Sequence, residues 1–265
     1  MIRKIVRNFL NKRGYEIIKQ PYIGKKYPNL SEDKSVYYCE TPIGKYYLPT
    51  KGLEKDAVAS MLVRGRFFEP EIIDIAKKFI REGTTVLDIG ANFGQMSIEF
   101  SKLTGSKGNV YSFEAQNFVH NFLNRNIQAN KCSNISLFEI AVWNTNDSTL
   151  FFPEPDMDSP APYSGNSAYI SREGSSVKTI TIDSLKIEEP ISFMKVDIEG
   201  ADIFALKGAR ETILKNKMAV IFEFSQHMQD DYQTTFNDYV KFVDSINYKF
   251  QQIILGVNYL IVPEF

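Results

Sequence analysis

The sequence predicts an α/β fold with a Rossmann-like, mostly parallel sheet that carries helices on both faces. From Thr84 onward, short apolar runs typical of buried strands alternate with segments of helical periodicity. A turn with two glycines follows the first of these runs, at residues 90–94. The chain has 265 residues, 43% of them hydrophobic, which is enough for one sizeable core.

The N-terminal part predicts three elements before the alternation begins. Apolar side chains recur at helical spacing among basic ones over residues 1–12, which predicts a short basic amphipathic helix. Residues 35–47 predict a β-hairpin around a turn at 41–44, and residues 67–81 predict a helix with Pro70 near its first turn. We therefore expect an N-terminal extension over residues 1–65 and a second domain over residues 66–265.

The alternating part can be divided at its turn residues. The expected strands are 85–89, 109–113, 135–142, 191–196 and 218–224, the expected helices are 95–103, 118–129, 201–215 and 236–246, and residues 248–255 and 259–262 are expected to form an antiparallel pair. Prolines with small polar residues interrupt this rhythm over residues 153–176, which predicts a loop. Whether that loop is a substrate lid or a segment without function is left open.

Charge and cysteine content restrict the class of protein. The formal net charge of −1 argues against a nucleic-acid partner, which would favour a basic stripe. No run approaches the roughly 20 apolar residues of a membrane span. The basic N-terminal helix either packs on the domain with its polar face in solvent or makes weak peripheral contact with an anionic membrane surface or an acidic partner. Cys39 and Cys132 have no metal-like spacing and predict free thiols in a cytoplasmic protein. The oligomeric state is not predicted.

The glycine turn at residues 86–94 (VLDIGANFG) favours a nucleoside ligand other than a dinucleotide. A dinucleotide fingerprint needs G-x-G-x-x-G, and neither register of Gly90 supplies the other two glycines. Asp88 at the strand tip would repel a pyrophosphate but tolerate the amine of a methionine group. Glu114 ends the next strand, twenty positions beyond Gly94, where an acid that binds ribose hydroxyls is expected.

Several further motifs, together with this turn, resemble those of the FkbM-type methyltransferases. They are SFEA at 112–115, TIDSL at 181–185, FMKVDIEG at 193–200, ALKGA at 205–209 and FEF at 222–224. The resemblance spans about residues 67–225. It implies a class I methyltransferase fold with a seven-stranded sheet whose last strand is antiparallel. It also implies S-adenosylmethionine as cofactor and O-methylation of a sugar, glycan or small-molecule natural product.

The expected site gathers at the carboxyl ends of the strands. Asp197 or Glu199 would accept or orient the substrate hydroxyl, Asp197 alternatively holds the methionine amine, and His227 is a second candidate base. Glu69 and Glu223 are candidates for substrate contact, and Trp143 either walls the adenine pocket or belongs to the core. The expected cofactor-binding residues are Asp88, Gly90, Ala91, Asn92, Gly94, Glu114, Ala115, Ala141, Val142 and Asp197.

Two other functions and a metal ligand are alternatives to an S-adenosylmethionine-dependent methyltransferase. The failed glycine register and Asp88 argue against an NAD-dependent oxidoreductase, and the intact acidic motifs argue against a non-catalytic S-adenosylmethionine-binding module. The carboxylates of Asp197, Glu199 and Glu223 are also ligands that a hard divalent cation accepts, although a metal is not expected. Alignment of the reactants should contribute more to the rate than a general base.

Overall fold

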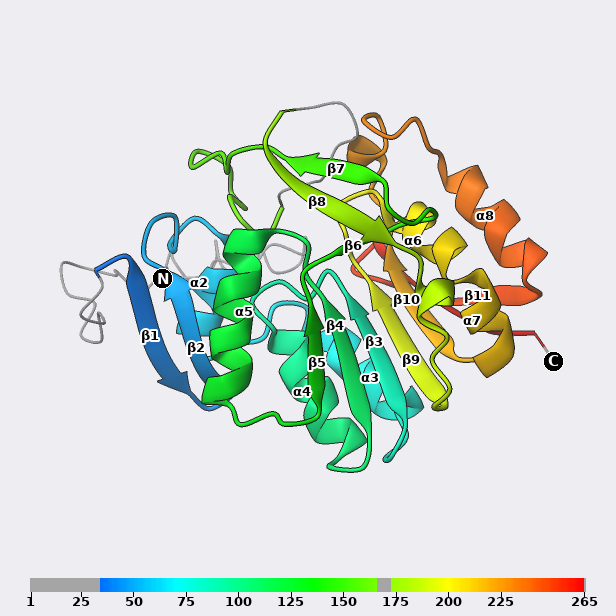
Figure 1. Ribbon diagram of the computed structural model, residues 1–265, viewed down its shortest axis with the longest axis horizontal. Helices are drawn as coiled ribbons and strands as arrows, with labels where there is room; N and C mark the ends of the chain where they lie inside the picture. The colour runs from blue at the N-terminus through cyan, green and yellow to red at the C-terminus, as the bar shows by residue number, and fades with distance from the viewer. Residues whose placement is uncertain (1–33, 166–172, 265) are drawn as a thin grey trace, which may run out of the picture.

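The computed structural model describes residues 34–165 and 173–264, and a seven-stranded sheet lies at its centre (Figure 1). The strands follow the order β11-β12-β10-β9-β3-β4-β5. Strands β10, β9, β3, β4 and β5 are parallel, and β12 is antiparallel to both of its neighbours. The mostly parallel sheet with an antiparallel last strand is therefore confirmed. Its strands are β3 (Thr85–Ile89), β4 (Asn109–Phe113), β5 (Ile135–Phe138), β9 (Ile191–Val196), β10 (Ala219–Glu223), β11 (Tyr248–Ile254) and β12 (Asn258–Pro263).

Helices cover both faces of this sheet because its strands alternate apolar side chains between the two faces. Val86 of β3 and Phe193 of β9 pack with α3 (Pro70–Phe79) and α4 (Gln95–Thr104). Leu87 and Met194, one residue further along the same strands, pack on the opposite face. The helices of that face are α6 (Asp202–Gly208), α7 (Arg210–Asn216) and α8 (Phe236–Ser245).

A separate β-hairpin precedes the sheet, as the sequence predicts. Its strands β1 (Val36–Thr41) and β2 (Gly44–Pro49) pair antiparallel, and β2 packs against α5 (Asn117–Ala129). The amide of Tyr47 donates to Oδ1 of Asn126 at 2.6 Å, and Nδ2 of Asn126 donates to the carbonyl of Phe93 at 2.9 Å. One buried asparagine thus links the hairpin to the loop after β3. The predicted helix at residues 1–12 lies outside the described residues.

Three short strands form a further sheet that the sequence did not predict. The expected strand 135–142 is two strands, because β5 ends at Phe138 and β6 (Ala141–Val142) leaves the main sheet. Strand β6 pairs with β8 (Ser175–Ile180), and β8 pairs with β7 (Thr149–Phe152). The expected loop 153–176 therefore connects the paired strands β7 and β8, and its last two residues belong to β8 (Figure 1).

Two further expectations on helices need correction. The predicted helix 201–215 is divided into α6 and α7 at Ala209, next to the point where α6 meets the backbone after β6. A side chain on Gly208 would lie 1.9 Å from the carbonyl oxygen of Trp143. A helix α2 (Ala57–Val63), followed by the left-handed Gly65, was not predicted. Among the described residues, no helix is long and apolar enough to span a bilayer.

Candidate active site

A cavity of about 410 Å³ opens at the carboxyl ends of β3, β4, β9 and β10. This is the edge at which open α/β sheets bind ligands. Most of the residues expected to form a site line it, although they come from six separate parts of the chain. They are Glu69, Gly90, Ala91, Asn92, Glu114, Ala115, Ala141, Val142, Asp197, Glu199, Glu223 and His227.

The turn after β3 brings two strand ends into backbone contact. Gly90 has a φ of 79°, and a side chain there would lie 1.8 Å from the carbonyl oxygen of Asp197. The amides of Gly90 and Ala91 both donate to the carbonyl of Phe113 at 3.0 Å. Gly90 is therefore required for the close approach of β3 and β9, and the turn is fixed to the end of β4.

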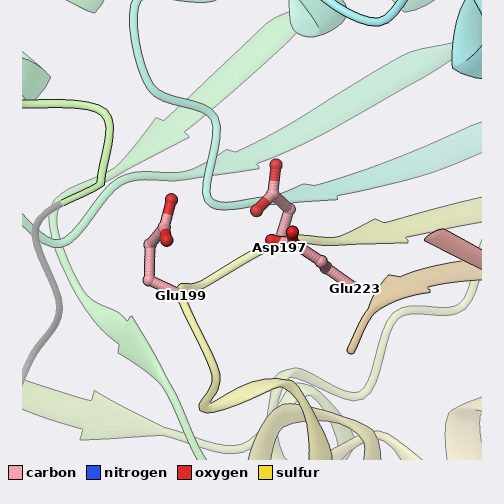
Figure 2. A group of neighbouring side chains, drawn as sticks. All are labelled: Asp197, Glu199 and Glu223. Atoms are coloured by element: carbon pink, nitrogen blue, oxygen red, sulfur yellow. The ribbon is translucent and has the colours of Figure 1, made fainter. Parts of the chain in front are cut away.

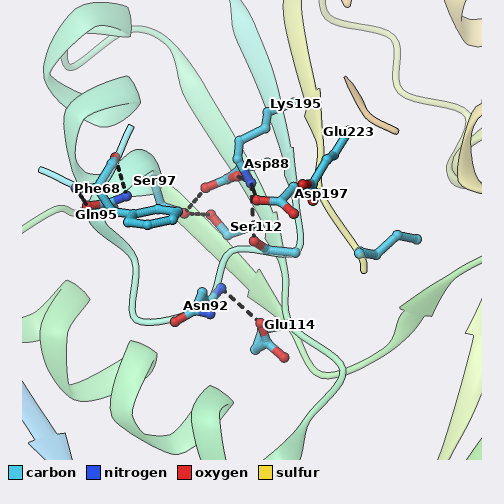
Figure 3. Close-up of polar contacts among 12 residues, drawn as sticks. Phe68, Asp88, Asn92, Gln95, Ser97, Ser112, Glu114, Lys195, Asp197 and Glu223 are labelled. Atoms are coloured by element: carbon cyan, nitrogen blue, oxygen red, sulfur yellow. Dashed lines mark hydrogen bonds and ion pairs between the residues drawn. The ribbon is translucent and has the colours of Figure 1, made fainter. Parts of the chain in front are cut away.

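Glu114, at the end of β4, holds the same turn through its side chain. Its Oε2 accepts a hydrogen bond from the amide of Asn92 at 2.8 Å (Figure 3). Its Oε1 accepts one from the amide of Gln116 at 2.9 Å. Burial raises the pKa of Glu114 to about 7, although these two amides favour its ionised form. Each oxygen keeps a further lone pair for a hydroxyl in the cavity.

Asp88 lies beneath the cavity and does not line it, in contrast to the expected direct ligand contact. Asp88 is fully buried, and its Oδ2 accepts a hydrogen bond from Oγ of Ser97 at 2.5 Å. The Oγ of Ser97 in turn accepts a hydrogen bond from Oγ of Ser112 at 2.8 Å. Its Oδ1 lies 3.9 Å from Nζ of Lys195, its partner in the β3–β9 ladder. Because β3 is buried on both faces, the side chain of Asp88 points into the protein beneath the site and contacts Ser97 and Lys195 there.

Lys195 connects that floor to the cavity. Its Nζ lies 3.1 Å from Oδ2 of Asp197 and donates to the carbonyl of Gly90 at 3.4 Å (Figure 3). Burial lowers the pKa of Lys195, but the carboxylates of Asp197 and Asp88 outweigh burial and raise the pKa above its ordinary value. The lysine is therefore the charged link between three strand-end groups.

Gly94 is also absent from the cavity wall. Its φ is 90°, and a side chain there would lie 2.4 Å from Cδ1 of Leu123 on α5. The glycine therefore allows α4 to start close to α5.

Three carboxyl groups lie close together at the ends of β9 and β10. One oxygen each of Asp197, Glu199 and Glu223 lies within 4.8 Å of the others (Figure 2). Burial and the neighbouring carboxylate of Asp197 raise the pKa of both Glu199 and Glu223. The cluster can accept a proton or hold a cation, which its oxygen ligands would suit.

Asp202 positions this cluster and was missed from the sequence. It is fully buried, and its two oxygens accept from the amides of Glu223 at 3.0 Å and Ile198 at 3.3 Å. Burial and the charge of Asp197 raise the pKa of Asp202 to about 7. In the sequence, Asp202 resembles any acid in the first turn of a helix, and only the fold reveals its partners.

Glu69 reaches the cavity from the segment before α3. Its backbone is left-handed, with a φ of 51°, and its Oε1 accepts from Nδ2 of Asn258 at 2.9 Å. The side chain of Gln95 holds this segment through two 2.9 Å hydrogen bonds with the backbone of Phe68 (Figure 3). Burial and Asp197 raise the pKa of Glu69 to about 7.

Trp143 and His227, which the sequence singled out, also line the cavity. Trp143 lines the cavity and also stacks on Phe204 with ring centroids 4.3 Å apart, so it belongs to both the pocket and the core. The Nδ1 of His227 shares a 2.8 Å hydrogen bond with Oγ of Ser225. His227 is exposed to solvent, unlike the carboxylates beside it.

Residues 88–250, which carry the turn, Glu114 and the carboxylate cluster, match the family model of the methyltransferase FkbM domain. The chain belongs to the FkbM methyltransferase family. The sheet described above is accordingly that of a class I methyltransferase. No curated protein sequence matches the chain.

Solved structures of methyltransferases are also similar to the chain, with low sequence identity. Methyltransferase FkbM from Methylobacillus flagellatus KT is 16% identical, with a TM-score of 0.43 over 81% of this chain and 55% of that one. An S-adenosylmethionine-dependent O-methyltransferase from Thermotoga maritima is 13% identical, with a TM-score of 0.46 over 84% and 75%. An rRNA methylase from Streptococcus thermophilus is 12% identical, with a TM-score of 0.44 over 72% and 92%.

In this FkbM-family chain, Lys195 is expected to be essential for stability. Lys195→Met should lower the free energy of unfolding by about 3–5 kcal/mol, because it leaves Asp88 buried without a counter-charge. Adding Asp88→Asn should recover part of that loss. Urea unfolding of the single and double variants measures both effects.

Lys77→Met provides the matched control, since Lys77 pairs with Asp74 on an exposed helix face. It should cost less than about 1 kcal/mol. A Lys195→Met variant as stable as this control would contradict the structural importance of the buried lysine.

Proposed function

We propose that the chain is an S-adenosylmethionine-dependent O-methyltransferase that acts on a hydroxyl of a sugar, glycan or small-molecule natural product. One observation carries the proposal. The glycine turn and Glu114 meet at the ends of β3 and β4, and they open into the same cavity as the carboxylates of Asp197, Glu199 and Glu223. A site for a nucleoside thus adjoins a site for a proton acceptor.

The residues of the cavity suit the cofactor. Glu114 retains lone pairs for the two ribose hydroxyls while it holds the turn. Ala115, Ala141 and Val142 offer an apolar wall for the adenine. A sulfonium and an amine are cationic. Among the described residues that line the cavity, carboxylates outnumber Lys195, and this excess favours both groups. The same carboxylates disfavour the pyrophosphate of NAD.

The surroundings of Asp197 and Glu199 support different roles for the two residues. Asp197 forms an ion pair with Lys195 at 3.1 Å and also lines the cavity, so we assign it to the methionine amine. Glu199 has a raised pKa, which suits a group that takes the hydroxyl proton. Glu223 lies beside both and would orient the acceptor. When bound, S-adenosylmethionine supplies an activated methyl group, so the protein mainly aligns the hydroxyl with it.

Binding of S-adenosylhomocysteine to the purified protein tests the cofactor half of the proposal. The wild type should bind it in calorimetry, and Glu114→Gln should weaken binding about 100-fold, because hydrogen bonds to a charged group are lost. Glu139→Gln, a nearby acid outside the cavity wall, should bind normally. Absence of binding at millimolar ligand would refute the proposal.

Turnover tests the catalytic half. With an acceptor found by screening glycans and nucleotide sugars, Glu199→Gln should lower kcat by about 10²- to 10⁴-fold, the range for loss of a general base. Its affinity for S-adenosylhomocysteine should change little, whereas Asp197→Asn should lose affinity. A Glu199→Gln enzyme with wild-type kcat would exclude Glu199 as the base. Repeating the assay with a chelator determines whether the carboxylate cluster needs a divalent cation.

A further inference from the structure

A segment of the loop between β7 and β8 forms one wall of the cavity. We call residues 157–165 the strap. Six of its residues line the cavity, although the segment contains no strand or helix of its own. They are Ser159, Pro160, Ala161, Tyr163, Ser164 and Gly165. Irregular backbone in such a position needs partners that hold it in place.

Asp56 supplies most of these partners. It is fully buried, and its Oδ2 accepts from the amide of Tyr163 at 3.1 Å, the amide of Ser164 at 3.0 Å and Oγ of Ser164 at 3.1 Å. Its Oδ1 accepts from the amide of Ala59 at 2.9 Å and so caps α2. One carboxylate oxygen therefore bonds to the start of α2, and the other bonds to the strap, 107 residues further along the chain.

Other contacts join the same two segments. The hydroxyl of Tyr163 donates to the carbonyl of Lys51 at 3.0 Å, and Nζ of Lys55 donates to the carbonyl of Met157 at 2.8 Å. Gly52 has a φ of 75°, and a side chain there would lie 3.2 Å from Pro162. The close approach of the two segments is thus built into the backbone.

The ring of Tyr163 packs the strap against α5 and the glycine turn after β3. It stacks on Phe118 of α5 with centroids 5.1 Å apart and meets the edge of Phe93, in the glycine turn, at 6.4 Å. Ala57 and Val58, which follow Asp56 directly, line the cavity too. Asp56 consequently organises two adjoining pieces of the cavity wall.

We propose that Asp56 is a positioning residue that holds the strap over the cavity and thereby limits the escape of a bound S-adenosyl ligand. The part that concerns the ligand rests on the proposed function. The physical reason is that opening the strap withdraws three donors from a buried carboxylate, and such a group is costly to leave unpaired. The strap is therefore held closed by Asp56 itself and not by burial of large side chains alone.

Two substitutions at Asp56 separate the strap from the helix cap. Asp56→Asn keeps an oxygen for Ala59 but turns an NH₂ group toward the three donors of the strap. Asp56→Ser retains an N-cap oxygen and removes the strap acceptor. Asp158→Asn is the matched control. Asp158 lies in the strap with its side chain 97% exposed, and its 2.9 Å ion pair with Lys55 is a surface contact, which contributes little to stability.

The first measurement is amide hydrogen exchange of the ligand-free protein. Both Asp56 variants should accelerate exchange at Tyr163 and Ser164 by about 10- to 100-fold, the range for lost hydrogen bonds to a charged group. Exchange in β9 and all exchange in Asp158→Asn should stay at the wild-type rates. Unchanged exchange at Tyr163 and Ser164 in folded Asp56 variants would overturn the proposal.

The second measurement is the dissociation rate of S-adenosylhomocysteine, which should rise about tenfold or more in the Asp56 variants. An unchanged rate would show that the strap does not retain the ligand. If the wild type binds no ligand, the proposed function fails, and hydrogen exchange still decides whether Asp56 holds the strap. Should both Asp56 variants fail to fold, Ser164→Ala removes one donor and should raise exchange at Tyr163 a fewfold; no rise would contradict the proposal.

Discussion

The candidate site depends on one buried lysine. Nζ of Lys195 lies between Asp197 at 3.1 Å and Asp88 at 3.9 Å, and the lysine side chain is 4% exposed. Buried charges are tolerated only when they are paired, so this contact constrains the two central strands to one relative position. That position places Gly90 against the backbone of Asp197, where no larger residue would be accommodated. This position of the two strands sets the path of the turn, and with it the backbone amide that donates to Glu114. It also places Asp197 at the cavity.

The balance of charge above that lysine determines which ligands the cavity favours. Carboxyl groups enter it from the segment before α3 and from the ends of β4, β9 and β10, and burial raises the pKa of Glu69, Glu114, Glu199 and Glu223. A cationic ligand would relieve their mutual repulsion, whereas an anionic cofactor would increase it. This asymmetry supports a sulfonium cofactor, and it also explains why a divalent cation remains a chemically reasonable occupant of the cluster.

Local patterns predicted the centre of the fold well, and long-range contacts account for the differences. Strands β3, β4 and β9 were predicted with their observed bounds because each is a short apolar run between turn residues. The break at Ala209 and the pairing of β7 with β8 depend on contacts between distant segments, which periodicity does not encode. The same holds for the site. The strand-end acids were found by position, but Asp88 was placed in the cavity when its partners lie beneath it, and Asp56 was missed because its partners are 107 residues away.

The most direct test of the central claim is a crystal structure of the protein grown with S-adenosylhomocysteine. The ligand should occupy the cavity, with its ribose hydroxyls on Glu114, its adenine beside Ala141 and Val142, and its amino group toward Asp197. The network of Asp88, Lys195 and Asp197 should keep its present arrangement beneath it. A ligand bound elsewhere, or this cavity without the ligand at saturating concentration, would contradict the claim that the turn and Glu114 form a nucleoside site.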